Sequence, residues 1–193
     1  GHQSIDDEDV RSVIEVLKSD WLTTGPTVNQ FEQDLAGYVG AQHAVAVNSG
    51  TSALDIAVQA LDLPEGSEII TTPFTFAATS NAILYNGHSP VFADIDPATR
   101  NIDPDEIRKR ITPKTRAIIY VDYAGHPCAI DEIRDIARDH DLRLIEDACH
   151  ALGASYKGRK TGTFADMTIF SFHPVKPITT GEGGAVVTDD PEL

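Results

Sequence analysis

The chain has 193 residues, of which 41% are apolar and 23% are charged, as expected for one globular domain with an ordinary core. Its formal net charge of −15 argues against nucleic-acid binding, because phosphate backbones are bound by clustered Lys and Arg. No apolar run has the length of a membrane span, no charged-then-apolar leader opens the chain, and two cysteines without metal-ligand spacing indicate a reducing, cytoplasmic setting.

The first half of the chain predicts helices and strands in alternation. N-cap candidates and acids in 4–9 open an amphipathic helix that breaks at 21–26, and a second helix can end at Gly40. The strand 44–47 turns at 48–50 into a third helix, the strand 68–72 closes at Pro73, a helix runs from about Ala77 to Tyr85, and 90–94 is a third strand. The first three helices are predicted from apolar residues at helical spacing: Val10, Val13, Ile14 and Leu17; Val28, Phe31, Leu35 and Val39; Leu54, Ala57, Val58 and Leu61.

The second half continues the alternation. Asp103, Pro104 and Glu106 supply an N-cap, a first-turn proline and a capping-box glutamate for a short helix that extends to Arg110. A helix with Ile130 and Ile133 separates the strands 116–122 and 142–146, and the strands 167–171 and 185–188 follow. We therefore predict an α/β fold, a three-layer αβα sandwich with a seven-stranded, mostly parallel sheet, as one domain over residues 1–193.

Polar and reactive residues are concentrated where the predicted strands end. Parallel sheets bind ligands beyond the carboxyl ends of their strands. The segments at these ends are 48–52, 72–76, 122–125, 146–150 and 171–176. A ligand that touches several of them would meet phosphate donors, an aromatic face, an acid and an amine.

The segment 49–52 joins a strand to a helix, so its free backbone N–H groups and the helix dipole suit a phosphate. Gly50 contributes backbone there, Thr51 and Ser52 contribute hydroxyls, and Ser171 can add another hydroxyl. A plain N-cap turn is the alternative interpretation of this segment.

Three further residues suit a charged, flat ring. Asp147 follows a buried strand, where an unpaired carboxylate is costly, so it requires a cation such as a protonated ring nitrogen, unless it caps a helix. Phe76 can lie over such a ring or belong to the core, and His150 is either a ligand contact or a structural residue.

Lys176 lies between Pro174 and Pro177, which hold it on an irregular but stiff loop between two strands. An ordinary surface lysine is the alternative. Taken together, these segments predict a pocket for a phosphorylated, ring-protonated, lysine-linked cofactor, pyridoxal 5′-phosphate (PLP), and no metal site.

Four ordered motifs resemble the DegT/DnrJ/EryC1/StrS sugar aminotransferases. They are residues 48–54, 73–79, 146–154 and 171–184, and the resemblance extends from Gln3 to Asp189. It implies a fold-type I PLP enzyme that moves an amino group from glutamate to a nucleotide-linked keto-sugar in the biosynthesis of a cell-surface polysaccharide or glycan. The residues around Lys176, with 121–125, are most similar to the pseudaminic-acid pathway C4 aminotransferases, which act on a UDP-linked 4-keto-6-deoxy-N-acetylhexosamine.

The resemblance also implies roles for individual residues. Lys176 matches the Schiff-base lysine, which also moves protons during the reaction, and Asp147 matches the partner of the pyridine nitrogen. Because members with histidine in place of this lysine are dehydratases, Lys176 favours transamination. The remaining cofactor contacts implied are Phe76 stacked on the ring, His150 beside the ring and its 3′-oxygen, and Gly50, Thr51, Ser52 and Ser171 at the phosphate.

Members of this family are roughly twice as long and have a smaller C-terminal domain. In their homodimer that domain contacts the substrate and reaches the neighbouring cofactor phosphate, so the active site is expected at the subunit interface. Residues 1–193 are thus expected to be the PLP-binding major domain, and the first residue, Gly1, is expected to mark a processed, tagged or excised piece. The alternatives are a non-catalytic PLP-binding fragment, another PLP reaction such as dehydration or aminoshikimate-type synthesis, and a nucleotide-binding domain without PLP.

Overall fold

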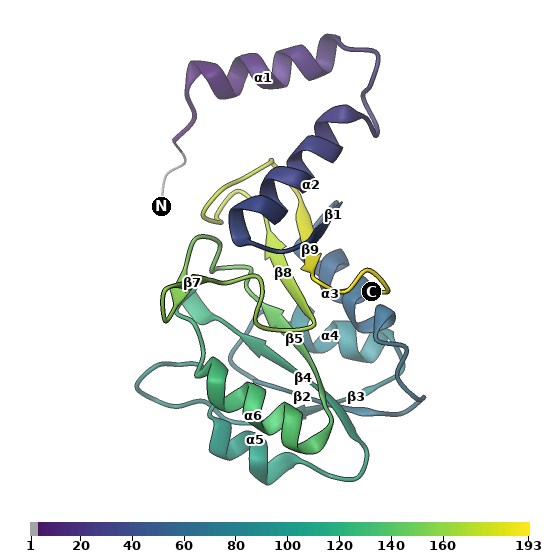
Figure 1. Ribbon diagram of the computed structural model, residues 1–193, viewed down its shortest axis with the longest axis vertical. Helices are drawn as coiled ribbons and strands as arrows, with labels where there is room; N and C mark the ends of the chain where they lie inside the picture. Colours follow the sequence, from purple (N-terminus) through teal and green to yellow (C-terminus); the bar gives the residue numbers. More distant parts are fainter. Residues whose placement is uncertain (1–3) are drawn as a thin grey trace.

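The computed structural model describes residues 4–193; residues 1–3, which the predicted domain includes, lie outside the described part. Helices and strands alternate from the amino to the carboxyl terminus (Figure 1). The helices are α1 (Asp7–Lys18), α2 (Pro26–Val39), α3 (Gly50–Ala60), α4 (Ala78–Tyr85), α5 (Pro104–Arg110), the short 3-10 turn η1 (Tyr123–Gly125) and α6 (Ile130–His140). The strands are β1 (His43–Val47), β2 (Glu68–Thr71), β3 (Ser89–Phe92), β4 (Thr115–Val121), β5 (Arg143–Asp147), β6 (Ser155–Tyr156), β7 (Arg159–Lys160), β8 (Met167–Ser171) and β9 (Gly184–Thr188).

Seven strands form one sheet in the order β1-β9-β8-β5-β4-β2-β3. Neighbours from β8 to β3 are parallel, whereas β9 is antiparallel to both β8 and β1. The seven-stranded, mostly parallel sheet predicted from the sequence is therefore confirmed. The small antiparallel pair of β6 and β7 was not predicted, because each strand has only two residues.

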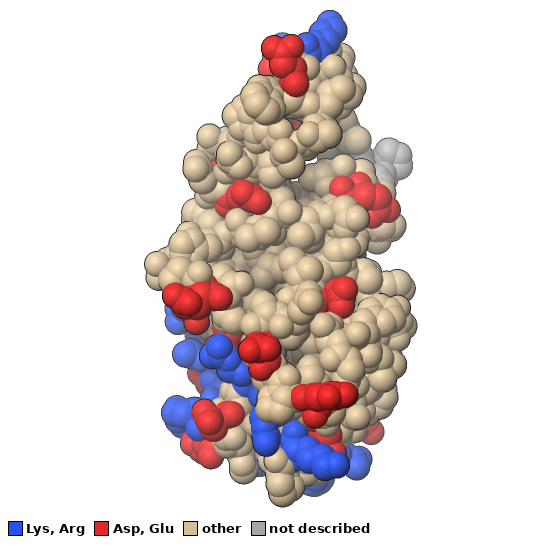
Figure 2. Space-filling model, turned by 90° about the vertical axis from the view of Figure 1, so that its right-hand side faces the viewer, with Lys and Arg blue, Asp and Glu red and all other residues tan. Residues whose placement is uncertain are grey.

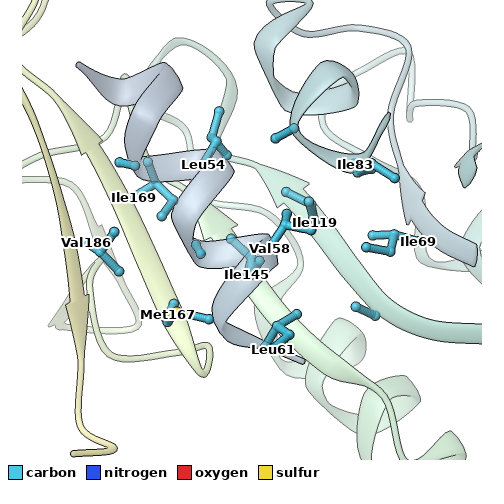
Figure 3. Close-up of a cluster of buried hydrophobic side chains, with 14 of the residues drawn as sticks. Leu54, Val58, Leu61, Ile69, Ile83, Ile119, Ile145, Met167, Ile169 and Val186 are labelled. Atoms are coloured by element: carbon cyan, nitrogen blue, oxygen red, sulfur yellow. The ribbon is translucent and has the colours of Figure 1, made fainter. Parts of the chain in front are cut away.

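Helices cover both faces of the sheet. On one face, Leu54 and Val58 of α3 pack against Ile145, Ile169 and other sheet residues (Figure 3). The opposite face is covered by α5 and α6, with Ile107 and Ile133, and by α2, with Leu35. Because Leu54 and Val58 are at most 2% exposed, each contributes about 1.5–3 kcal/mol to the free energy of folding.

Strand register brings the carboxyl ends of distant strands together. Val121 of β4 lies opposite Asp147 of β5, which in turn lies opposite Ile169 of β8. Gly184 of β9 lies between Val47 of β1 and Ser171 of β8. The segments that follow β1, β4, β5 and β8 therefore meet at one edge of the sheet.

Local capping interactions set several helix ends. Asp6 and Asp9 form a reciprocal capping box at the start of α1, and Asp103 accepts a hydrogen bond from the backbone N–H of Asp105 at the start of α5. The predicted capping-box role of Glu106 is wrong. Its carboxylate accepts a 2.6 Å hydrogen bond from Lys109 Nζ, while the Asp103 N–H is already bonded to the backbone oxygen of Asp94.

The first helix lies apart from the sheet, at the top of the view in Figure 1. It has the apolar spacing that the sequence predicts, but none of its residues is buried. Its apolar side chains and those that follow it are 41–65% exposed: Val10, Val13, Ile14, Leu17, Trp21 and Leu22. An apolar surface of this kind marks an interaction site in many proteins.

On the face shown in Figure 2, acidic side chains occur from one end to the other, and Lys and Arg gather mainly toward the end where Figure 1 places α5 and α6. Each helix among residues 4–193 is too short or too polar to span a bilayer.

Candidate functional site

A cavity of about 310 Å³ opens at the carboxyl ends of the strands, beside the amino-terminal ends of α3 and α4. Its volume lies at the lower end of the range for small-molecule sites. Seven of the eight residues predicted as site residues line it: Gly50, Thr51, Phe76, Asp147, His150, Ser171 and Lys176. Residues from segments more than 120 positions apart in the chain therefore line the same cavity.

The first turn of α3 forms one wall. The Ser49 Oγ atom accepts a 3.1 Å hydrogen bond from the backbone N–H of Ser52, while the amides of Gly50 and Thr51 precede the point at which the helix can supply an acceptor. A Cβ atom at Gly50 would lie 2.9 Å from Ser171 Cβ and 3.2 Å from Cys149 Sγ. The absent side chain thus allows the backbone to approach the cavity floor, as anion-binding turns require.

Ser52 is the predicted site residue that the cavity does not include. Its hydroxyl donates a 2.6 Å hydrogen bond to Asn48 Oδ1 and lies 3.1 Å from Ser49 Oγ. A side chain on the first turn of a helix can point into the adjoining cavity or away from it, and the sequence does not distinguish these two orientations.

Asp147 is 4% exposed and reaches the cavity from the end of β5. One carboxylate oxygen accepts a 2.8 Å hydrogen bond from Thr79 Oγ1, and the other accepts a 3.3 Å hydrogen bond from the backbone N–H of Cys149. Burial, and then the charge of Asp147, raise the pKa of the Cys149 thiol well above its ordinary range, so this thiol is neutral at pH 7.

Lys176 lies on the loop between β8 and β9 and is partly buried. Backbone hydrogen bonds hold this loop: the N–H of Lys176 donates to the carbonyl of His173 over 2.9 Å, and Phe172 bonds to Gly183 and Thr180. Lys176 lines the same cavity as Asp147, and both charges act on His150 and Cys149.

His150 is oriented by the turn that follows β4. Its Nδ1 atom accepts a hydrogen bond of 3.3 Å from the backbone N–H of Ala124, so Nε2 carries the proton of the neutral ring. Burial, and then the charge of Lys176, lower the pKa of His150, so the ring is neutral at pH 7. Gly125 is left-handed, with φ +82°, and a Cβ there would lie 2.9 Å from the His150 carbonyl oxygen.

Phe76 contributes the aromatic wall and is 76% exposed, which excludes the alternative that it belongs to the core. Residues to which the sequence assigned no role also line the cavity: Thr75, Thr79, Tyr123, Cys149, His173 and Glu182. Thr79 lies within one of the quoted motifs, but no sequence pattern links it to Asp147, 68 positions away.

A buried acidic pair lies near the cavity, on the opposite side of the sheet. Glu146 and Asp122 are both 0% exposed, and Glu146 Oε2 accepts hydrogen bonds from Thr168 Oγ1 and from the backbone N–H of Gly162. Asp122 has fewer donors, with one oxygen bonded to the Cys128 N–H and the other without a partner. Burial, and then the nearby Glu146, raise the pKa of Asp122 well above its ordinary range, so Asp122 is the member of the pair that holds a proton.

Within residues 4–193, no group of three or more His, Cys, Asp or Glu side chains is arranged to hold a metal ion. The cavity instead combines backbone donors for an anion, a buried carboxylate, an aromatic face and a primary amine. These groups suit a compound that carries both an anionic group and a positively charged flat ring and that can form a covalent bond with an amine.

The known proteins to which this chain is similar match it over nearly its whole length. The model of the DegT/DnrJ/EryC1/StrS aminotransferase family matches residues 3–193. A UDP-4-amino-4,6-dideoxy-N-acetyl-beta-L-altrosamine transaminase of Campylobacter jejuni is 47% identical over 195 residues, which cover 100% of this chain and 51% of that protein.

Two solved structures are similarly close. Helicobacter pylori PseC, an aminotransferase involved in the biosynthesis of pseudaminic acid, has a TM-score of 0.96 and 43% identity over 99% of this chain and 52% of its own. A candidate sugar aminotransferase of Streptococcus pneumoniae in its PLP-form has a TM-score of 0.93 and 33% identity over 98% of this chain and 53% of its own. The chain therefore spans about half the length of the relatives it matches, and it belongs to the DegT/DnrJ/EryC1/StrS aminotransferase family.

Proposed function

We propose that residues 1–193 are the PLP-binding major domain of a transaminase. In this proposal Lys176 holds the cofactor covalently and Asp147 faces its ring nitrogen. The remaining contacts are Phe76 over the ring, His150 beside it, and Gly50, Thr51 and Ser171 at the phosphate, with Ser52 supporting that turn through Ser49. The observation that carries the proposal is that Lys176 and Asp147 line one cavity together with the first turn of α3.

The residues present fit this cofactor. Among residues 4–193, the buried Asp147 forms no ion pair, so a protonated ring nitrogen would supply the positive charge that a buried carboxylate requires. Gly50 and Thr51 line the cavity on the first turn of α3, so their backbone N–H groups have no acceptor within the helix and would bind a phosphate there.

Bound PLP would supply an electron sink for breaking a C–H bond beside the amino group of the donor. Lys176 would form and release the covalent link, and its freed amine would move the proton between the donor carbon and the cofactor. Asp147 would hold the proton on the ring nitrogen throughout. His150, neutral at pH 7 and protonated on Nε2, would donate a hydrogen bond at the cavity wall.

We further propose glutamate as the amino donor and a nucleotide-linked, UDP-type 4-keto-6-deoxy sugar as the acceptor, in the biosynthesis of a cell-surface polysaccharide or glycan. The likeness to the Campylobacter jejuni transaminase and to Helicobacter pylori PseC supports this substrate class. Lys176 favours transamination over dehydration, because the dehydratases of this family have histidine at that position.

We also propose that the protein forms a homodimer and that it is located in the cytoplasm. The exposed apolar side chains of α1, together with Trp21 and Leu22, support a subunit interface at that end of the molecule. Cys128 and Cys149 are both free thiols, which suits a reducing compartment. Size-exclusion chromatography with light scattering tests the dimer: charged residues in place of Ile14 and Leu17 should produce a monomer.

The test of the function uses the protein at its full natural length. After reconstitution with PLP, the preparation should be yellow, lose this colour when glutamate is added, and release 2-oxoglutarate. The subsequent addition of a UDP-linked 4-keto sugar should restore the colour and yield an amino-sugar. A colourless preparation would exclude PLP binding, unchanged colour with glutamate would indicate a non-catalytic protein, and a dehydrated sugar product would indicate the other chemistry.

A further inference from the structure

Asp147 is connected to the cavity wall by two threonine hydroxyls. Thr79 Oγ1 lies 2.8 Å from Asp147 Oδ2, and Thr75 Oγ1 lies 2.9 Å from Thr79 Oγ1. Thr79 is 0% exposed on the first turn of α4, while Thr75 is partly buried and lines the cavity. These contacts join the loop before α4 to the end of β5.

The direction of the hydrogen bonds follows from the chemistry of the groups. A carboxylate only accepts hydrogen bonds, so the single hydroxyl proton of Thr79 is donated to Asp147. Thr79 Oγ1 can then only accept a hydrogen bond from the Thr75 hydroxyl, which is the first donor in this series of hydrogen bonds. The order is therefore Thr75 to Thr79 to Asp147.

We propose that Thr79 is a positioning residue that orients the Asp147 carboxylate and limits its attraction for the proton of the cofactor ring, with Thr75 as the outer member of the relay. This inference rests on the proposed function, because it assumes that Asp147 faces a ring nitrogen. A hydroxyl that donates to a carboxylate stabilises its negative charge. A carboxylate that lacks this donor competes more strongly for the ring proton, and its plane is free to turn.

The second oxygen of Asp147 does not replace the Thr79 contact. Its donor, the backbone N–H of Cys149, lies at 3.3 Å, which is longer than an ordinary hydrogen bond. The adjacent Cys149 thiol is neutral and only a weak donor. Thr79 therefore supplies the one short hydrogen bond to the Asp147 carboxylate from among residues 4–193.

The test compares Thr79→Val, which removes the hydroxyl at similar volume, with Thr79→Ser, which retains it. The matched control is Thr71→Val. Thr71 is also 0% exposed and donates one hydrogen bond of 2.9 Å, but to the carbonyl of Ile119 and away from Asp147. If Thr79→Val does not fold, Thr79→Ala replaces it, because the smaller side chain cannot crowd the carboxylate.

The primary readout is the ¹⁵N chemical shift of PLP labelled at the ring nitrogen and bound to each variant, together with the pH dependence of its visible absorption. In Thr79→Val we expect the ¹⁵N signal to move toward the unprotonated value and kcat for the glutamate half-reaction to fall on the order of ten- to a hundredfold, the loss of one hydrogen bond to a charged group. The KM for glutamate should change little. Thr79→Ser should restore both the ¹⁵N signal and kcat, and Thr71→Val should leave the ¹⁵N signal unchanged.

An unchanged ¹⁵N signal in Thr79→Val would overturn the inference, as would an equal change in Thr71→Val, since that result would show a general structural effect. If the unmodified protein binds no PLP, both the proposed function and this inference fail. If it binds PLP and reacts with glutamate while Thr79→Val behaves like the unmodified protein, the inference fails alone.

Discussion

Gly184 offers a strict test of how the β8–β9 hairpin supports the cavity. This residue is buried at the start of β9, and an added Cβ would lie 2.4 Å from both the carbonyl carbon and oxygen of Ser49 and 2.6 Å from the nitrogen of Gly50. Ordinary contacts of a Cβ begin near 3.4 Å, so Gly184→Ala requires a shift of about 1 Å, the difference between 3.4 and 2.4 Å. The contacted atoms are backbone, so no side-chain rotation can accommodate the methyl group.

Overpacking of a buried site costs about 1–3 kcal/mol and occasionally more, and we expect the upper end here because backbone must move. For a domain of this size, about 3 kcal/mol corresponds to a Tm decrease of about 6–12 °C. The displaced peptide joins Ser49 to Gly50 at the proposed phosphate wall. The Kd for PLP should therefore rise about tenfold or more, since hydrogen bonds to a charged group are weakened.

The assays are thermal unfolding without cofactor and fluorescence titration with PLP. Gly37→Ala is the matched control, because Gly37 is exposed within α2, and a Cβ there would meet nothing within 4 Å. This control should stabilise the protein by about 0.5–1 kcal/mol and leave PLP affinity unchanged. A Gly184→Ala protein with unchanged Tm and PLP affinity would refute our account of this close approach.

Three further predictions concern the acids and the turn near the cavity. Asp147→Asn should retain bound PLP but lower kcat/KM on the order of 100-fold, about 3 kcal/mol, in steady-state assays; a normal rate would contradict its proposed role. Because the pKa of Asp122 is raised in the folded protein, the unfolded chain binds fewer protons than the folded protein above about pH 4. The free energy of unfolding therefore falls as the pH rises toward the folded-state pKa. Asp122→Asn should remove this pH-dependent loss. In urea unfolding, the free energy of unfolding of the variant minus that of the unmodified protein should therefore increase with pH; a difference that does not depend on pH would contradict the proposed protonation of Asp122. Gly125→Ala should cost about 1–3 kcal/mol by thermal unfolding and exceed the cost of Gly66→Ala, which has similar φ but open space around it; equal costs would exclude the contact with His150.

The sequence predicted most of the fold because its signals are local. Apolar patterns together with capping and turn residues predicted six helices and seven strands. The rule that ligands bind beyond the carboxyl ends of parallel strands grouped residues as distant as Thr51 and Lys176. The pairing of β9 with β1 depends on contacts between segments about 140 residues apart, which no local pattern records.

Features missed by the sequence depend on side-chain direction and on long-range contacts. The Ser52 hydroxyl bonds to Asn48 and lies beside Ser49, and Ser52 is not among the cavity-lining residues; its orientation on the helix turn is not recorded in the sequence. Glu106 pairs with Lys109 because the donor it was expected to cap is already bonded to Asp94. Thr79 was not recognised because a buried threonine in an apolar segment resembles core until Asp147 is brought beside it.

The most direct test of the central claim is to identify the residue that binds the cofactor. The protein is incubated with PLP, reduced with borohydride, digested and analysed by mass spectrometry, with Lys176→Arg as the control. The account predicts one phosphopyridoxyl-modified peptide, carrying the group on Lys176, and none in the variant. Modification of a different lysine, or equal labelling of the Lys176→Arg protein, would contradict it.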